Sequence, residues 1–292
     1  MAVTNFASAG ELYVRKNGSG PPVLFIHGTG ADADIWGEAY DIVARSCHAI
    51  AYDRRGFSRS FPDARVDHYR THADDAAALL GALTEEAATL VGWSSGGPIA
   101  LDLALSHPDL VAGLVLVEPV SVQPATLTPG AMAMLLQGKS RQLLRGDHNA
   151  AKWFYRWATA YKHGGTGFDA MPPALREAEI ANASASMREI QTAWPSARHQ
   201  TRKTLNTIVK PTLVLLSDSG KNGSWYARTG RFIASAIPGA QVETIAGSCH
   251  AMFRDNPQAF ADHVVEMAYS AHGRPVSTTG GRTPGNNHVN AG

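Results

Sequence analysis

Residues 89–100 read TLVGWSSGGPIA. A short β-favouring run, Thr89–Val91, leads into Gly92-Trp93-Ser94-Ser95-Gly96, and a helical pattern begins near Ser95. Glycines two positions before and two positions after Ser94 allow a strand and a helix to approach closely around a strained turn. Such a turn presents the Ser94 hydroxyl at a helix N-terminus, where negative charge is favoured. We therefore predict that Ser94 is a nucleophile.

Further apolar runs of strand length alternate with helical patterns along the chain. Runs without polar alternation indicate strands buried on both faces of a parallel sheet, and helices between them indicate βαβ crossovers. The predicted class is therefore α/β, and we expect Ala9–Lys16 to form part of an antiparallel hairpin at the sheet edge. The expected strands are Val23–Ile26, Ala49–Tyr52, Thr89–Val91, Leu114–Val117, Leu213–Leu216 and Val242–Ile245, and the expected helices are Ile35–Ala44, Thr71–Leu83, Ser95–Ser106, Trp225–Ala236 and Pro257–Tyr269.

One long region, Val120–Asn206, interrupts this alternation. Its segments have helical patterns, and turn residues separate them. We expect a helical cap over residues 121–206, a core domain over residues 1–120 and 207–271, and a disordered tail over residues 272–292, which lack large apolar side chains. The expected cap helices are Gly130–Leu144, Ala150–Tyr161, Ala174–Ala181 and Ser186–Thr192.

A serine hydroxyl is a weak nucleophile unless a base activates it. His250 follows the last expected strand, in Gly247-Ser248-Cys249-His250, and is the predicted general base; we expect no catalytic role for Cys249. An oxyanion needs two N–H donors. We expect the amides of Ser95 and Thr29 to supply them, with Gly30 as the alternative to Thr29.

We expect the loop His27-Gly28-Thr29-Gly30 to line the substrate pocket, because glycine lets the backbone face a substrate. We expect Gly28 and Trp93 to contact the substrate, and His27 to be structural. The apolar side chains of the cap are expected mainly to form its own core, with some lining the pocket, where aromatic and methionine side chains are common. Trp153 is the cap residue that we assign to the pocket.

Composition limits the remaining possibilities. The chain has 292 residues and a formal net charge of +1, which gives no basic footprint for nucleic acid. Two cysteines fit a reducing compartment, and no signal peptide or membrane-length apolar segment is visible, so a cytoplasmic location is expected. His68 and His72 lie near three aspartates, but on a polar helix face, so we expect no metal and no cofactor. The expected partner is a small molecule; the sequence does not indicate the oligomeric state.

The order of these motifs resembles the α/β-hydrolase superfamily over Ala9 to about Tyr269. The resemblance implies an eight-stranded, mostly parallel sheet with a helical cap inserted after the sixth strand, and a serine, acid and histidine in chain order. Members that cleave epoxides or carbon–halogen bonds use an aspartate nucleophile, so Ser94 favours a carboxylic ester or lactone hydrolase, or a C–C hydrolase. The matching segments are His27-Gly28-Thr29-Gly30, Asp53-Arg54-Arg55-Gly56-Phe57-Ser58, Gly92-Trp93-Ser94-Ser95-Gly96, Pro211-Thr212-Leu213-Val214 and Gly247-Ser248-Cys249-His250.

The acid departs from the commonest pattern of the superfamily. Gly220 occupies the usual position of the acid, and Asp218 lies two residues earlier on a glycine-rich loop. Other members of the superfamily carry the acid at the end of the strand that precedes the cap. In this chain the carboxylate at that position is Glu118. A carboxylate that follows four buried apolar residues needs a partner, because an unpaired buried charge is costly. We favour Glu118 and keep Asp218 as the alternative.

Two other functions fit parts of the sequence. Gly28-Thr29-Gly30-Ala31-Asp32-Ala33 matches a dinucleotide-binding fingerprint, with Asp53 as the ribose-binding acid of an oxidoreductase. That interpretation leaves Ser94 and His250 without a role. A non-enzymatic small-molecule receptor on the same fold could share every residue, and only turnover distinguishes it. The favoured function is a serine hydrolase that acts on a small, largely apolar substrate.

Overall fold

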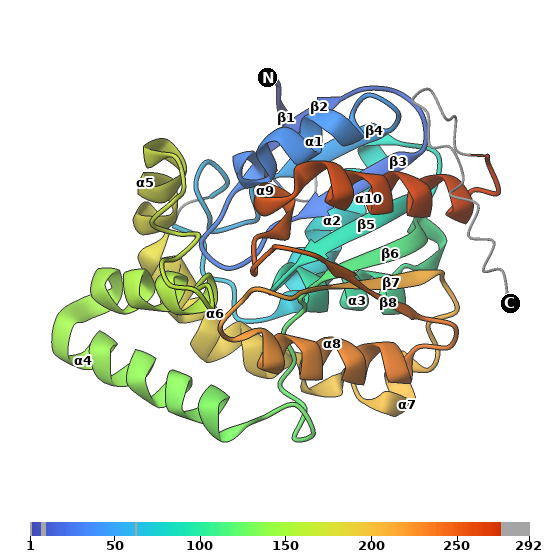
Figure 1. Cartoon of the computed structure of the whole chain (residues 1–292). Helices are drawn as coiled ribbons and strands as arrows, with labels where there is room; N and C mark the ends of the chain where they lie inside the picture. Colours follow the sequence, from blue (N-terminus) through green and yellow to red (C-terminus); the bar gives the residue numbers. More distant parts are fainter. Residues whose placement is uncertain (1, 7–9, 62, 276–292) are drawn as a thin grey trace, which may run out of the picture.

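The computed structural model describes residues 2–6, 10–61 and 63–275, and its centre is an eight-stranded sheet (Figure 1). The strand order is β1-β2-β4-β3-β5-β6-β7-β8; the pairs β1–β2 and β2–β4 are antiparallel and the other pairs are parallel. The predicted α/β class is confirmed. The strands are β1 (Ala2–Phe6), β2 (Gly10–Asn17), β3 (Pro22–Ile26), β4 (His48–Tyr52), β5 (Ala88–Trp93), β6 (Val111–Val117), β7 (Thr212–Ser217) and β8 (Gln241–Ile245).

Burial follows the apolar runs that predicted the strands. Every residue of β3 and β5 is buried, as expected for central parallel strands. Strand β8 lies at the edge, and its first four residues are exposed. Because β3, β5, β6 and β7 are neighbouring parallel strands, their carboxyl ends lie side by side at one edge of the sheet.

Helices cover both faces of the sheet. Helix α10 packs on β5 and β6 and contacts α1, whereas α3 packs on β3, β5 and β6 from the opposite side and contacts α2, and α8 packs on β7 and β8. Figure 1 shows α8 and α10 on opposite sides of the sheet. The core helices are α1 (Gly37–Val43), α2 (Tyr69–Leu83), α3 (Gly96–Ser106), α8 (Gly223–Ala236), α9 (Met252–Asp255) and α10 (Pro257–Ala271), with the short 3₁₀ helices η1 (Ala33–Trp36) and η2 (Pro108–Leu110).

A helical cap lies between β6 and β7, at the position expected after the sixth strand. Two predicted helices join into one element, α4, which turns at Gly146 with a φ of 77° and forms two arms (Figure 1). Only glycine adopts this angle without strain, so the turn depends on that residue. The cap consists of α4 (Pro129–Ala158), α5 (Pro173–Ala181), α6 (Ala183–Ser196), the 3₁₀ helix η3 (Ala197–His199) and α7 (Arg202–Leu205).

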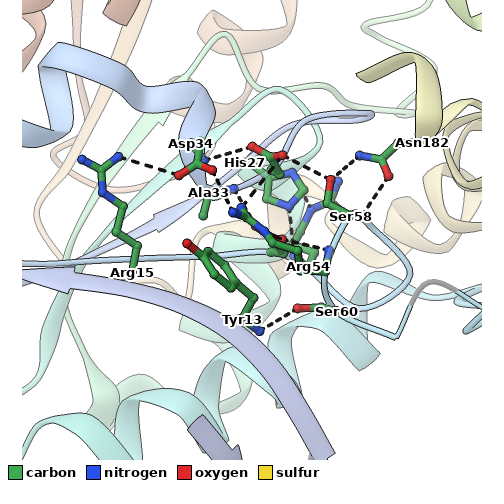
Figure 2. Close-up of polar contacts among 12 residues, drawn as sticks. Tyr13, Arg15, His27, Ala33, Asp34, Arg54, Ser58, Ser60 and Asn182 are labelled. Carbon is green, nitrogen blue, oxygen red and sulfur yellow. Dashed lines mark hydrogen bonds and ion pairs between the residues drawn. The ribbon is translucent and has the colours of Figure 1, made fainter. Parts of the chain in front are cut away.

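Buried polar contacts connect the cap to the core. Arg54 Nη1 donates to Glu189 of α6 over 2.6 Å, and both side chains are almost fully buried. Arg54 Nη2 also donates to the carbonyl oxygen of Gly28 over 3.1 Å. Asn182 donates to the carbonyl oxygen of Gly30 over 2.9 Å and accepts from the amide of Ser58 over 2.8 Å. Figure 2 shows Arg54 beside His27, and Asn182 reaching Ser58.

The C-terminal helix ends at Ala271, and the next residues remain attached to the core. His272 hydrogen bonds through Nε2 to the carbonyl oxygen of Ala87 over 3.0 Å, and Arg274 pairs with Glu86 over 2.9 Å. These residues belong to the segment that we expected to be a disordered tail; the rest of that segment, residues 276–292, lies outside the described residues. Within the described ranges, no helix combines the length and the apolar character needed to cross a membrane.

Candidate active site

A left-handed backbone conformation holds Ser94 at the junction of β5 and α3. Its φ is 53°, a value that residues with a side chain rarely adopt, and its amide donates to the carbonyl oxygen of Val117 over 3.0 Å. A Cβ on Gly96 would lie 2.1 Å from the carbonyl oxygen of Ile26, and a Cβ on Gly92 would lie 2.6 Å from that of Gly96. The strained turn and the close approach expected from the glycine spacing are both present.

His250 and Glu118 are in direct contact at this edge of the sheet. His250 Nδ1 lies 2.8 Å from Glu118 Oε2, and both side chains are at most 3% exposed. Because an ionised carboxylate only accepts hydrogen bonds, it fixes the proton of the imidazole on Nδ1. The other ring nitrogen, Nε2, is then left as an acceptor.

The Glu118 carboxylate is held at both of its oxygens. Oε1 accepts from the amide of Ser217 over 3.0 Å and from its hydroxyl over 2.5 Å, while Oε2 contacts His250. The backbone of Glu118 is strained, with a φ of 39°, and its amide donates to the carbonyl oxygen of Leu215. Contacts on both oxygens thus hold the carboxylate against the imidazole.

Aromatic rings fix the plane of the imidazole. The ring of Tyr226, on α8, stacks on His250 with centroids 4.0 Å apart and an interplanar angle of 13°. Trp93 donates from Nε1 to the carbonyl oxygen of His250 over 2.8 Å. The residue before the candidate nucleophile therefore also fixes the loop that carries the candidate base.

Asp218, the alternative acid, lies elsewhere. Its side chain is exposed, and Oδ1 accepts from the amide of Gly247 over 2.9 Å and from the Ser219 hydroxyl over 2.7 Å. The hydrogen bond from Ser219 has the largest effect on the pKa of the Asp218 carboxyl, and together these hydrogen bonds lower that pKa. The structure therefore gives Asp218 a role in shaping the loop before His250, while Glu118 is the carboxylate that reaches the imidazole.

The loop after β3 lies beside Ser94. Thr29 Oγ1 donates to Ser95 Oγ over 3.1 Å, so the two residues expected to supply amide donors are adjacent. A Cβ on Gly28 would lie 3.1 Å from Ser94 Cβ and 3.0 Å from the Trp93 ring, which shows how closely this backbone approaches the turn. His27 Nε2 accepts from the amide of Arg54 over 2.9 Å, consistent with the structural role expected for it.

A small cavity joins the candidate residues to the cap. Thr29, Trp93, Ser94 and His250 line it from the core side. Trp153 does not: the structure places it in a second, more apolar cavity within the cap, beside Met134 and Met187. Its neighbour Phe154 reaches the Ser94 cavity because consecutive helical residues point in different directions. The cap residues of the Ser94 cavity are Phe154, Tyr155, Ala158, Thr159 and Glu179.

Glu179 is an acidic side chain of α5 that the sequence analysis did not single out. Its side chain is buried, and burial raises the pKa of its carboxyl to about 8; Arg254 lowers this pKa and Asp32 raises it. Tyr155 donates to its backbone carbonyl oxygen over 3.0 Å. In the sequence, a glutamate between Ala178 and Ile180 looks like an ordinary solvent-exposed helical residue. Its burial beside Ser94 becomes apparent only when the cap is placed over the site.

The residues of the dinucleotide fingerprint make contacts within the protein. Asp53 is fully buried and accepts from the amide of Ala33 and from Arg59, so its carboxylate is not open to a ribose. A Cβ on Gly30 would lie 2.4 Å from the Tyr155 hydroxyl, so the cap occupies the space above this loop. Among the described residues, no group of three or more His, Cys, Asp or Glu side chains is arranged to hold a metal ion.

Comparison with known proteins identifies the family of the chain. Residues 21–257 match the family model described as the alpha/beta hydrolase fold. An uncharacterized hydrolase of Bacillus subtilis, YraK, is 40% identical over 115 residues, which are 39% of this chain and 42% of that protein. The matched segment is thus less than half of this relative.

Solved structures share the architecture. A thermophilic esterase from Thermogutta terrifontis superposes with a TM-score of 0.72 at 23% identity, covering 92% of this chain and 98% of that one. The enol-lactonase from Burkholderia xenovorans LB400 superposes with a TM-score of 0.71 at 19% identity, covering 91% of this chain and 99% of that one. At these identities the likeness concerns the fold.

Proposed function

The chain belongs to the α/β-hydrolase family, and from that membership and the geometry of the site we propose that it is a serine hydrolase that cleaves a carboxylic ester or lactone through an acyl-enzyme. The observation that carries this proposal is the buried contact between His250 Nδ1 and Glu118, 2.8 Å long, at the same sheet edge as Ser94. An esterase and a lactonase have the same fold, so the proposed reaction is one that this fold is able to carry.

In the acylation step, Ser94 Oγ attacks the substrate carbonyl carbon and His250 Nε2 accepts the hydroxyl proton. The imidazolium that forms is stabilised by Glu118, whose second oxygen is held by Ser217. His250 then gives the proton to the leaving alkoxide oxygen, and the carbon–oxygen bond breaks. The acyl group remains on Ser94 Oγ.

In the deacylation step, water replaces the alcohol. His250 Nε2 takes a proton from water, the hydroxide oxygen attacks the acyl carbon, and the proton returns to Ser94 Oγ. In both steps the amides of Ser95 and Thr29 donate to the oxyanion. The close packing of Gly28 against Ser94 supports this assignment, because it brings the loop after β3 to the nucleophile.

A panel of p-nitrophenyl esters and lactones tests the proposal. The wild-type protein is expected to show a burst of p-nitrophenol followed by steady turnover, and Ser94→Ala and His250→Ala each to lose several orders of magnitude in kcat. Esters and lactones that bind without any turnover would instead favour a small-molecule receptor. Turnover that persists in Ser94→Ala would contradict the acyl-enzyme.

A further inference from the structure

The Glu179 carboxyl is a buried polar group without a protein partner. Its side chain is 4% exposed and lines the same cavity as Ser94 and His250. In the part of the chain that the structure describes, no side chain or amide donates a hydrogen bond to this carboxyl, and no cation pairs with it within 4 Å. Tyr155 donates its hydrogen bond to the backbone oxygen of Glu179 and not to the carboxyl.

Such a group is costly for the folded protein. A buried carboxyl without a partner loses its hydration and gains nothing in return, so buried carboxyls in proteins are ordinarily paired. The two other buried glutamates at the core–cap boundary and the sheet edge follow this rule, because Glu189 pairs with Arg54 and Glu118 with His250. Glu179 differs from both, because no described protein group pairs with its carboxyl.

The lining of the cavity does not oppose a bound cation. None of the described residues that line it is a lysine or an arginine, and His250 is committed to Glu118. Asp32 adds negative charge from a distance, and Arg254 is near enough to lower the pKa of Glu179 without bonding to it. The rings of Trp93, Phe154 and Tyr155 line the same space, and aromatic faces attract cations.

We propose that Glu179 recognises a protonated amino group on the substrate of Ser94, so that the protein selects cationic esters or lactones over neutral and anionic ones. This inference rests on the proposed serine hydrolase function. Burial raises the pKa of the carboxyl to about 8, so the carboxyl mostly holds a proton at neutral pH in the free protein. A bound ammonium group favours the ionised form and becomes the missing partner of the carboxylate. A neutral or anionic substrate cannot form this ion pair.

A pair of matched substrates tests the proposal. They are the p-nitrophenyl esters of an ω-(dimethylamino)alkanoic acid and of the branched alkanoic acid in which carbon replaces nitrogen, compared at three chain lengths. The wild-type protein is expected to favour the cationic ester in kcat/KM. In Glu179→Gln, which keeps the size of the side chain, the ratio between the two esters is expected to fall by roughly tenfold or more.

Glu177→Gln is the control, because Glu177 is an exposed glutamate on the same helix. Its ratio is expected to equal that of the wild type, and thermal melts establish that both variants are folded. An unchanged ratio in Glu179→Gln, or a wild-type preference for the neutral ester, would overturn the proposal while leaving the hydrolase function intact.

Binding separates this proposal from the hydrolase function. Calorimetry on Ser94→Ala with the corresponding methyl esters is expected to show tighter binding of the cationic ester, and loss of that preference when Glu179→Gln is added. A preserved binding preference in a protein that never turns over an ester would refute the hydrolase function alone. Equal binding of both esters would refute the recognition of a cation.

Discussion

His250 Nδ1 lies 2.8 Å from Glu118 Oε2, although 132 positions separate the two residues in the chain. The contact links the loop after β8 with the end of β6, across the end of β7, whose Ser217 holds the other carboxylate oxygen. A strand end fixes the direction of a side chain better than a loop does. The geometry therefore favours Glu118 over Asp218 as the partner of the candidate base.

Substituting these two carboxylates is expected to have unequal effects. Glu118→Gln removes the acceptor that sets the imidazole tautomer and stabilises the imidazolium, so kcat is expected to fall by a factor on the order of 10³–10⁴. Asp218→Asn leaves His250 and Glu118 in contact and is expected to cost far less. Steady-state kinetics with one p-nitrophenyl ester measures both, and a crippled Asp218→Asn beside a nearly normal Glu118→Gln would reject the assignment.

The ion pair between Arg54 and Glu189 is expected to contribute strongly to cap docking. Arg54→Met leaves the Glu189 charge buried without a partner, which typically costs roughly 3–5 kcal/mol in the free energy of unfolding. The double substitution Arg54→Met with Glu189→Met is expected to cost less than the single one, because no charge is left stranded. Urea denaturation measures each variant.

The control for this pair is Arg156, whose contact with Asp169 is exposed. Arg156→Met is expected to change the free energy of unfolding by about 0–1 kcal/mol. If Arg54→Met cost no more than Arg156→Met, the buried pair would not be the anchor of the cap.

Glu179 is expected to make stability depend on pH. Burial raises the pKa of this carboxyl from 4.5 to about 8, so the folded protein binds one more proton than the unfolded chain between these values. With respect to this carboxyl, the folded protein is most stable at low pH, where both states hold the proton. Its free energy of unfolding falls as the pH rises from 4.5 toward 8, because only the unfolded chain releases the proton in this range. Relative to Glu179→Gln, the wild type is therefore expected to lose stability across this range, by about 1.4 kcal/mol for each unit of pKa shift. Urea denaturation at several pH values, with Glu177→Gln expected to follow the wild type, measures the difference; parallel curves for Glu179→Gln and the wild type would contradict it.

Substrate choice is expected to depend on Phe154 more than on Trp153. Phe154 lines both the Ser94 cavity and the apolar cavity within the cap, so Phe154→Ala joins the two spaces. Longer acyl chains are expected to gain in relative kcat/KM, whereas Trp153→Ala is expected to leave the chain-length profile unchanged. A Phe154→Ala variant that slowed every ester by the same factor would show that Phe154 does not select the acyl chain.

Features set by neighbouring residues could be predicted from the sequence. The apolar runs and the glycine spacing around Ser94 predicted the strands, the turn and the α/β class, because burial and backbone freedom are local requirements. The place of the cap followed from the absence of strand patterns between β6 and β7. The sequence favoured Glu118 over Asp218 as the acid, but the contact between Glu118 and His250 depends on how the strands lie side by side in the sheet.

Features that depend on how the cap docks could not be predicted. Trp153 and Phe154 are adjacent aromatic residues, and no pattern says which of them faces the core. Arg54 was noted as part of a family motif, but its partner Glu189 lies 135 positions away. Glu179 has the surroundings of a solvated helical residue, and its burial arises only when α5 closes over the site.

Covalent labelling tests the central claim most directly. The wild-type protein is treated with an alkyl fluorophosphonate, digested, and mapped by mass spectrometry, beside Ser94→Ala and His250→Ala. The account predicts one adduct, on Ser94, that is absent in Ser94→Ala and forms far more slowly in His250→Ala, because the hydroxyl then lacks its base. An adduct on another residue, or equal labelling of Ser94→Ala, would contradict it.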